Sequence, residues 1–199
     1  MADGGEASLH WVFGYGSLIW NPGFAHLAAV PARLSGAHRS LCVYSHRHRG
    51  TIAHPGLVFG LMPGGSCHGM AFAVAAARWD AAYDYLVERE QDAGVYREVM
   101  RPLRLKEGRA VRALVFMADP DHAQYAGRLP VAEQVAIVRG ARGQSGANID
   151  YVLATVDKLT SLGIVDRRLV DIAALLRGEG PPAAVYAADK SASGLAPSR

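Results

Sequence analysis

The chain has 199 residues, of which 50% are hydrophobic, 20% charged and 8% aromatic, a composition typical of a globular protein. A domain of this length buries about 70% of the surface that its unfolded chain exposes, so its stability requires neither disulfides nor a structural metal. The formal net charge of +3 favours small anionic ligands only mildly, and it is too low for the strongly basic surface that is typical of nucleic-acid-binding proteins. Composition therefore predicts one globular domain without a nucleic-acid partner.

Cysteine usage and the uncharged stretches indicate a cytoplasmic protein. Cys42 and Cys67 both lie in apolar stretches, and one possible pair is not a disulfide framework. Residues Met1–Glu6 lack the basic and apolar pattern of a signal peptide. Ala7–Ala32 and Gly50–Ala77 have no charged residue and are long enough to cross a membrane, but glycines, prolines and histidines interrupt them. We therefore read them as short buried strands and expect no membrane partner.

Strands dominate the first two thirds of the chain, because short apolar runs rich in β-branched and aromatic residues alternate with turn residues. Glycine-containing turns at Ser35–Gly36 and Glu107–Gly108 separate pairs of strands, and Pro63–Gly65 predicts a further hairpin. The expected strands are Trp11–Tyr15, Val30–Leu34, Arg39–Tyr44, Leu57–Met62, Cys67–Val74, Tyr96–Leu105 and Ala110–Met117.

Helices are expected mainly in the last third. The expected helices are Ala75–Asp92, Pro130–Arg139, Ile149–Leu162 with Asn148 as its N-cap, and a short helix to Leu176 that Asp166 caps. Strands followed by helices predict an α+β domain with a compact, mostly antiparallel, barrel-like sheet and flanking helices. We expect a single domain over residues 1–178 and a poorly ordered tail over 179–199, where alanine, serine and proline accumulate.

The segment Gly14–Ile19 begins like a dinucleotide-binding fingerprint. Ile19 replaces the third glycine, and the chain turns at Pro22 instead of opening a helix, so this function is excluded. What remains is a strand that runs into a tight turn with two glycines, where a ligand can approach backbone N–H groups closely. A bulge or a pair of packing glycines explains the same pattern.

Helical phase singles out one glutamate in the first expected helix. With 100° per residue, Trp79, Tyr83, Leu86 and Glu90 share the apolar face, whereas Glu88 lies on the opposite face. Burial raises the pKa of a carboxyl group toward the range that is useful for acid/base catalysis. Glu90 is therefore a candidate catalytic residue, although a partner arginine or a frayed helix end accounts for its position equally well.

Other polar clusters have simpler interpretations. The histidines and arginines of residues 46–54 have no cysteine or carboxylate to complete a metal-ligand spacing, so we expect no metal site. The arginines around the Glu107–Gly108 turn are typical of a solvated strand face. Tyr151, early in the third expected helix, is either a core aromatic or a ligand contact.

The segment Trp11–Trp20, with the sequence Trp-Val-Phe-Gly-Tyr-Gly-Ser-Leu-Ile-Trp, resembles the opening motif of the ChaC family of glutathione-specific γ-glutamylcyclotransferases. The resemblance extends from about Trp11 to Leu176. Further matching segments are His48–Thr51, Pro55–Val58, Gly69–Phe72, Tyr85–Glu90, Tyr96 and Gly143–Tyr151.

This resemblance implies a γ-glutamylcyclotransferase-like fold and an enzyme that converts glutathione to 5-oxoproline and cysteinylglycine without a cofactor. It implies that Glu90, which ends the Tyr-Leu-x-x-Arg-Glu pattern, is the acid/base, and we expect no obligate protein partner. The substrate-binding residues implied by the family are Val12, Phe13, Gly14, Tyr15, Gly16, Ser17, Leu18 and Tyr151.

The sequence is also compatible with two other functions. One is a non-catalytic sensor or regulator that binds a γ-glutamyl ligand, and the other is a cyclotransferase that acts on other γ-glutamyl amines. A buried Glu90 argues against the sensor, because a pocket that only binds gains little from a buried carboxylate.

Overall fold

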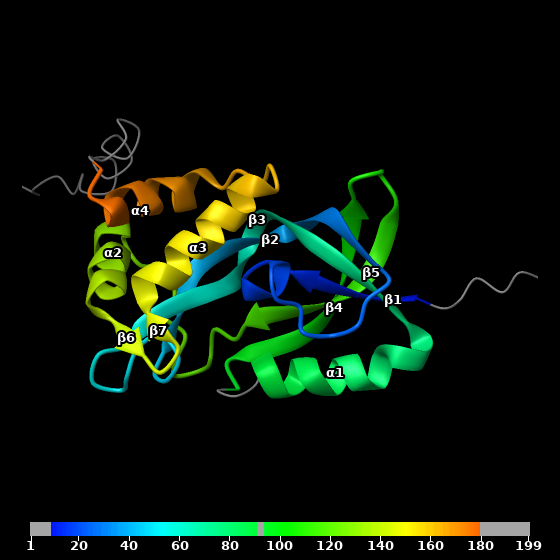
Figure 1. Cartoon of the computed structure of the whole chain (residues 1–199), viewed down its shortest axis with the longest axis horizontal. Helices are drawn as coiled ribbons and strands as arrows, with labels where there is room; N and C mark the ends of the chain where they lie inside the picture. The colour runs from blue at the N-terminus through cyan, green and yellow to red at the C-terminus, as the bar shows by residue number, and fades with distance from the viewer. Residues whose placement is uncertain (1–8, 91–93, 180–199) are drawn as a thin grey trace, which may run out of the picture.

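The computed structural model describes residues 9–90 and 94–179 (Figure 1). The expected tail lies, from residue 180 onward, outside the described residues. The elements are β1 (Leu9–Gly14), the 3-10 turn η1 (Ser17–Ile19), β2 (Ala28–Ser45), β3 (Gly56–Ala75), α1 (Ala76–Glu90), β4 (Tyr96–Leu105), β5 (Ala110–Ala118), α2 (Val131–Gly140), β6 (Arg142–Gly143), β7 (Gly146–Ala147), α3 (Asn148–Ser161) and α4 (Arg167–Arg177).

Strands β1 to β5 form a closed barrel in the order β1-β3-β2-β4-β5. Neighbouring strands are antiparallel, and β1 closes the barrel by pairing in parallel with β5 at Val12 and Leu114. Helix α1 lies on one side of the barrel, whereas α2, α3 and α4 gather on another side (Figure 1). The predicted α+β class, with a mostly antiparallel barrel-like sheet and flanking helices, is confirmed.

The hairpin predicted across Pro63–Gly65 is wrong, and so is the break predicted at Ser35–Gly36. The chain there continues as two long strands, β2 with 18 residues and β3 with 20, which pair along their whole length. The register shifts between Ser35–Ser66 and Ala37–Pro63, so that Gly36 lies opposite Gly64 and Gly65, all three with positive φ. These glycines form a β-bulge that bends both strands without reversing them.

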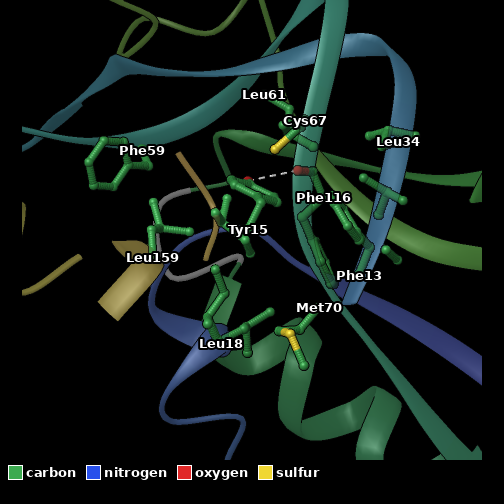
Figure 2. Packing of buried hydrophobic residues seen from close by; sticks show 14 of the residues in the cluster. Phe13, Tyr15, Leu18, Leu34, Phe59, Leu61, Cys67, Met70, Phe116 and Leu159 are labelled. Atoms are coloured by element: carbon green, nitrogen blue, oxygen red, sulfur yellow. Dashed lines mark hydrogen bonds between the residues drawn. The ribbon is translucent and has the colours of Figure 1, made fainter. Parts of the chain in front are cut away.

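The barrel interior is filled by large apolar side chains, including the fully buried Phe13, Leu34 and Phe116 (Figure 2). Figure 2 also shows Tyr15, whose hydroxyl donates a hydrogen bond of 2.8 Å to the Phe116 carbonyl at the edge of this core. Because a buried hydroxyl needs a partner, this bond fixes the Tyr15 ring at the point where β1 leaves the barrel.

The helices occur where they were expected, with one difference in capping. Asp166 caps α4 as predicted, since its side chain accepts a hydrogen bond from the Leu169 N–H. Asn148 is not the N-cap of α3: Ala147 occupies that position, and the fully buried Asn148 amide bonds instead to both backbone groups of Leu57 at 2.7 and 2.8 Å. The asparagine therefore connects α3 to β3.

The loop between β2 and β3 lies against the β6–β7 hairpin (Figure 1). Backbone N–H groups of Gln144 and Ser145 donate to carbonyls of Arg47 and His48. A Cβ on Gly143 would come within 2.4 Å of the Arg47 carbonyl oxygen, so only glycine permits this approach. The two loops therefore form one packed unit beside the end of the barrel.

Candidate functional site

A cavity of about 1010 Å³ lies at the end of the barrel where β1, β2 and β5 end and where β3 and β4 begin. Its lining combines the η1 turn, the C-terminal end of α1, the β2–β3 loop and single residues of β4, β5 and α3. The lining residues are Tyr15–Leu18, Trp20, Asn21, Val43–Arg49, Val58, Phe59, Tyr85, Glu88–Glu90, Val95, Tyr96, Phe116, Gln124, Ser145 and Tyr151.

Glu90 is the last residue of α1 and lines this cavity. Its side chain is only 17% exposed, and burial raises the pKa of its carboxyl group, an effect that the Arg89 guanidinium 3.5 Å away partly opposes. Leu86, one turn earlier, is fully buried, whereas Glu88 is exposed and contributes only to the lining. The predicted difference in exposure between Glu88 and Glu90 is therefore confirmed. Glu90 also has the partner arginine that was the alternative explanation for its position, so it is both buried and paired.

The η1 turn presents backbone donors to the cavity. In the described part of the chain, the N–H groups of Gly16, Ser17 and Leu18 donate to no protein acceptor, and all three residues line the cavity. Arg89 holds the turn from α1, because its Nη2 donates to the Ser17 hydroxyl at 2.9 Å and its Nη1 to the Asn21 carbonyl at 2.6 Å. Arg89 thus connects the turn to the end of α1 that carries Glu90.

A buried arginine fixes the orientation of the peptide that begins this turn. Arg39 of β2 donates from Nε to the Tyr15 carbonyl and from Nη2 to the His68 carbonyl, and its Nη1 lies 3.5 Å from the Asp166 carboxylate. In a trans peptide the C=O and the following N–H point in opposite directions. Since the Tyr15 carbonyl points at Arg39, the Gly16 N–H points in the opposite direction, away from Arg39.

Three tyrosines surround Glu90, and two of them are anchored on one residue of β3. Tyr96 donates its hydroxyl to the Phe59 carbonyl at 2.9 Å, while the Tyr151 hydroxyl accepts from the Phe59 N–H at 3.4 Å. Burial raises the pKa of Tyr15 and Tyr96 and raises that of Tyr151 to about 12. All three phenols therefore stay neutral near pH 7 and act as hydrogen-bonding groups.

Arg49 lines the cavity on the side of the β2–β3 loop. Its Nη1 donates to the Ser145 and Ala147 carbonyls at 2.6 and 3.3 Å. The guanidinium carbon lies 5.2 Å from the centre of the Tyr151 ring, a cation–π distance. The arginine is thus held over the face of the Tyr151 ring, which also lines the cavity.

The residues predicted to bind substrate fall into two groups. Tyr15, Gly16, Ser17, Leu18 and Tyr151 line the cavity together with Glu90, whereas Val12, Phe13 and Gly14 lie in β1 outside the lining. Val12 and Phe13 are fully buried in the barrel core. Their predicted binding role stays a prediction, and the structure gives them a packing role.

Sequence reasoning assigned no role to Arg39, Tyr96 or Arg49. A signal for Arg39 was available, because it is the one charged residue of the predicted strand Arg39–Tyr44, and a charge that is buried in a sheet requires partners. Tyr96 and Arg49 fall in segments that match the family motifs, but only the fold places their side chains at the cavity.

Residues 9–90 and 94–179 contain no group of three His, Cys, Asp or Glu side chains arranged to hold a metal ion. None of the helices in these ranges has the length and apolar character that crossing a membrane requires. Cys42 and Cys67 are both buried and free, and burial raises the pKa of their thiols to about 12 and about 11.

Comparison with known proteins shows to which family a chain with this fold and cavity belongs. Residues 10–179 match the family model described as ChaC-like protein, which covers most of the chain. The chain belongs to the ChaC-like family. The relatives of this ChaC-like protein include a glutathione-specific γ-glutamylcyclotransferase of Escherichia coli, 33% identical over 81% of this chain and 70% of the relative. Another is glutathione-specific γ-glutamylcyclotransferase 1 of Danio rerio, 32% identical over 86% of this chain and 90% of the relative.

A solved structure shows the same fold as this ChaC-like protein. The crystal structure of a γ-glutamyl cyclotransferase specific to glutathione from yeast superposes with a TM-score of 0.79 at 22% identity. The match covers 86% of this chain and 96% of the yeast chain. The barrel with its flanking helices is therefore the fold of the yeast protein.

Proposed function

We propose that this ChaC-like protein is a glutathione-specific γ-glutamylcyclotransferase that releases 5-oxoproline and cysteinylglycine. The observation that carries this proposal is the placement of a buried carboxyl group, Glu90, in one cavity with the N–H groups of Gly16–Leu18, which donate to no acceptor within residues 9–90 and 94–179. Relatives named for this activity, at 31–33% identity over most of their length, support the same assignment.

The reaction first requires a base. The α-amino group of the γ-glutamyl residue is an ammonium near neutral pH, with a pKa of about 8, and an ammonium has no lone pair to attack a carbonyl. Glu90 removes one proton, and the neutral amine then forms a bond to the carbon of its own γ-glutamyl amide. Because the raised pKa of Glu90 makes it a stronger base than an ordinary carboxylate, burial favours this transfer.

The second half requires an acid. The Glu90 carboxyl returns its proton to the cysteine nitrogen as the amide C–N bond breaks, and the second proton shed by the ring nitrogen also ends on the new amine. The lactam keeps one N–H, and cysteinylglycine leaves as an ammonium. One carboxyl group therefore serves both steps, and no covalent enzyme intermediate forms.

The η1 turn supplies the anion site for this reaction. The N–H groups of Gly16, Ser17 and Leu18 bind the α-carboxylate of the γ-glutamyl residue or the oxyanion that develops at its carbonyl. Tyr151 and Tyr96 border the turn and Glu90 and restrict the flexible γ-glutamyl chain to its ring-closing shape. The free, buried cysteines fit the reducing cytoplasm, which we propose as the compartment.

Product analysis tests the proposal. Purified protein is incubated with glutathione, and 5-oxoproline and cysteinylglycine are quantified by mass spectrometry. Equal amounts of both products are expected. If glutathione stays intact while it still protects the protein against thermal unfolding, the protein is a γ-glutamyl-ligand sensor and the proposed activity is wrong.

A further inference from the structure

Arg49 is a cavity-lining cation without a carboxylate partner among the described residues. Two other arginines near the cavity are paired with carboxylates, Arg89 with Glu90 and Arg39 with Asp166. Within the described part of the chain, Nη1 is the donor of every hydrogen bond that the Arg49 guanidinium makes. Nε and Nη2 have no acceptor among these residues. The remaining edge of this guanidinium is a donor pair of the kind that binds a carboxylate with two parallel hydrogen bonds.

The guanidinium is also held in place before any ligand arrives. Two carbonyls, of Ser145 and Ala147, fix one nitrogen, and the Tyr151 ring supports its face at 5.2 Å. These carbonyls belong to the β6–β7 hairpin, which is itself bonded to the β2–β3 loop that carries Arg49. An arginine ordered in this way loses little side-chain entropy on binding an anion, which strengthens the interaction.

Tyr151 connects this cation to the turn at the other side of the cavity. A Cβ built on Gly16 would lie 3.8 Å from the Tyr151 hydroxyl, while the ring of the same tyrosine carries the Arg49 guanidinium. The Tyr151 side chain therefore lies between the η1 turn and Arg49, close to both. In an extended peptide two residues span roughly 7 Å, so a dipeptide leaving group reaches across such a ring.

We propose that Arg49 binds the C-terminal carboxylate of the substrate and so selects γ-glutamyl peptides whose leaving group ends in a free carboxylate two residues beyond the scissile bond. This inference rests on the proposed function and extends it. The η1 turn holds the γ-glutamyl end of the substrate, and Arg49 binds the carboxylate at the opposite end. γ-Glutamyl amines and esters lack this second anchor.

A substrate-by-variant comparison tests the subsite. Values of kcat/KM are measured for glutathione and for its glycine monoethyl ester with wild type, Arg49→Gln and the control Arg142→Gln, whose side chain is exposed on the neighbouring β6 strand. Because charge-assisted hydrogen bonds are the strong ones, we expect wild type and Arg142→Gln to prefer the free acid by about tenfold or more. In Arg49→Gln the preference falls to within about twofold.

Each other outcome has a distinct meaning. If Arg49→Gln lowers kcat/KM equally for both substrates, the arginine only supports the loop and the subsite assignment is wrong. The assignment is also overturned if wild type does not distinguish acid from ester. If wild type produces no 5-oxoproline, the proposed function fails, and dissociation constants of the same two compounds, measured by calorimetry with the same three proteins, decide the subsite separately.

Discussion

Glu90 combines two features that the proposed reaction uses: a buried carboxyl group and a position facing the substrate cavity. Burial raises the pKa of this group above its ordinary value of 4.5, and the base must be ionised to accept the ammonium proton. Activity therefore increases as pH rises through the raised pKa of Glu90. A profile of kcat/KM for glutathione is expected to show an acidic limb with its midpoint above 4.5, and a midpoint at or below 4.5 would contradict the assignment.

The same pKa shift has a consequence for stability. A carboxyl group whose folded-state pKa is raised contributes stability below its unfolded pKa, and this contribution is lost as pH rises through the folded pKa. Glu90→Gln removes that loss. We expect the melting temperature of the variant, relative to wild type, to increase between pH 4 and pH 7, and thermal melts at both pH values measure it. A relative decrease would show that the ionised Glu90 stabilises the fold.

Arg39 acts through the peptide that it holds. Lysine has a single nitrogen and cannot replace the separate bonds to the Tyr15 and His68 carbonyls. In Arg39→Lys the Gly16 N–H loses its fixed orientation, and a displacement of about 1 Å in a catalytic group costs about a hundredfold in rate. We expect kcat to fall far more than KM rises. The exposed Arg33→Lys on the same strand is the control, and unchanged kcat in Arg39→Lys would remove the positioning role.

At the level of elements, α3 is connected to β3 by one asparagine. Asn148→Ala leaves both backbone groups of Leu57 unpaired in a fully buried position, at roughly 1–3 kcal/mol for each unsatisfied group. The free energy of unfolding is expected to fall by about 2–6 kcal/mol in denaturant titrations. Gln144→Ala, on the exposed hairpin nearby, serves as the control and should change it by less than about 0.5 kcal/mol.

Some helices and strands of this fold can be predicted from the sequence, and others cannot. The β4–β5 hairpin and the four helices follow from local signals, namely periodicity, caps and a two-residue glycine turn. Gly36, Gly64 and Gly65 misled the prediction because a positive φ fits a reversing turn and a β-bulge equally well. Only the pairing of β2 with β3 along their whole length decides between these two structures, and that pairing is a long-range property.

Across the whole molecule, the cavity is assembled from segments that lie far apart in the chain. Helical phase identified Glu90, and the turn at Gly14–Leu18 was recognisable as a place where a ligand meets backbone N–H groups. The bond between Arg39 and Asp166 spans 127 positions, and the contact of Arg49 with Tyr151 joins a loop to a helix. No local pattern encodes such pairs, so the supporting residues of the site emerged only with the closed barrel.

In the proposed mechanism Glu90 is both the acid and the base of ring closure. The most direct test measures 5-oxoproline formation from glutathione by wild type, Glu90→Gln and Glu88→Gln, the last being an exposed glutamate on the same helix. We predict that Glu90→Gln binds glutathione and melts cooperatively but loses at least about a hundredfold in kcat, as expected when a general acid/base is removed. Glu88→Gln is predicted to stay within about twofold of wild type. Turnover by Glu90→Gln at the wild-type rate would contradict the mechanism.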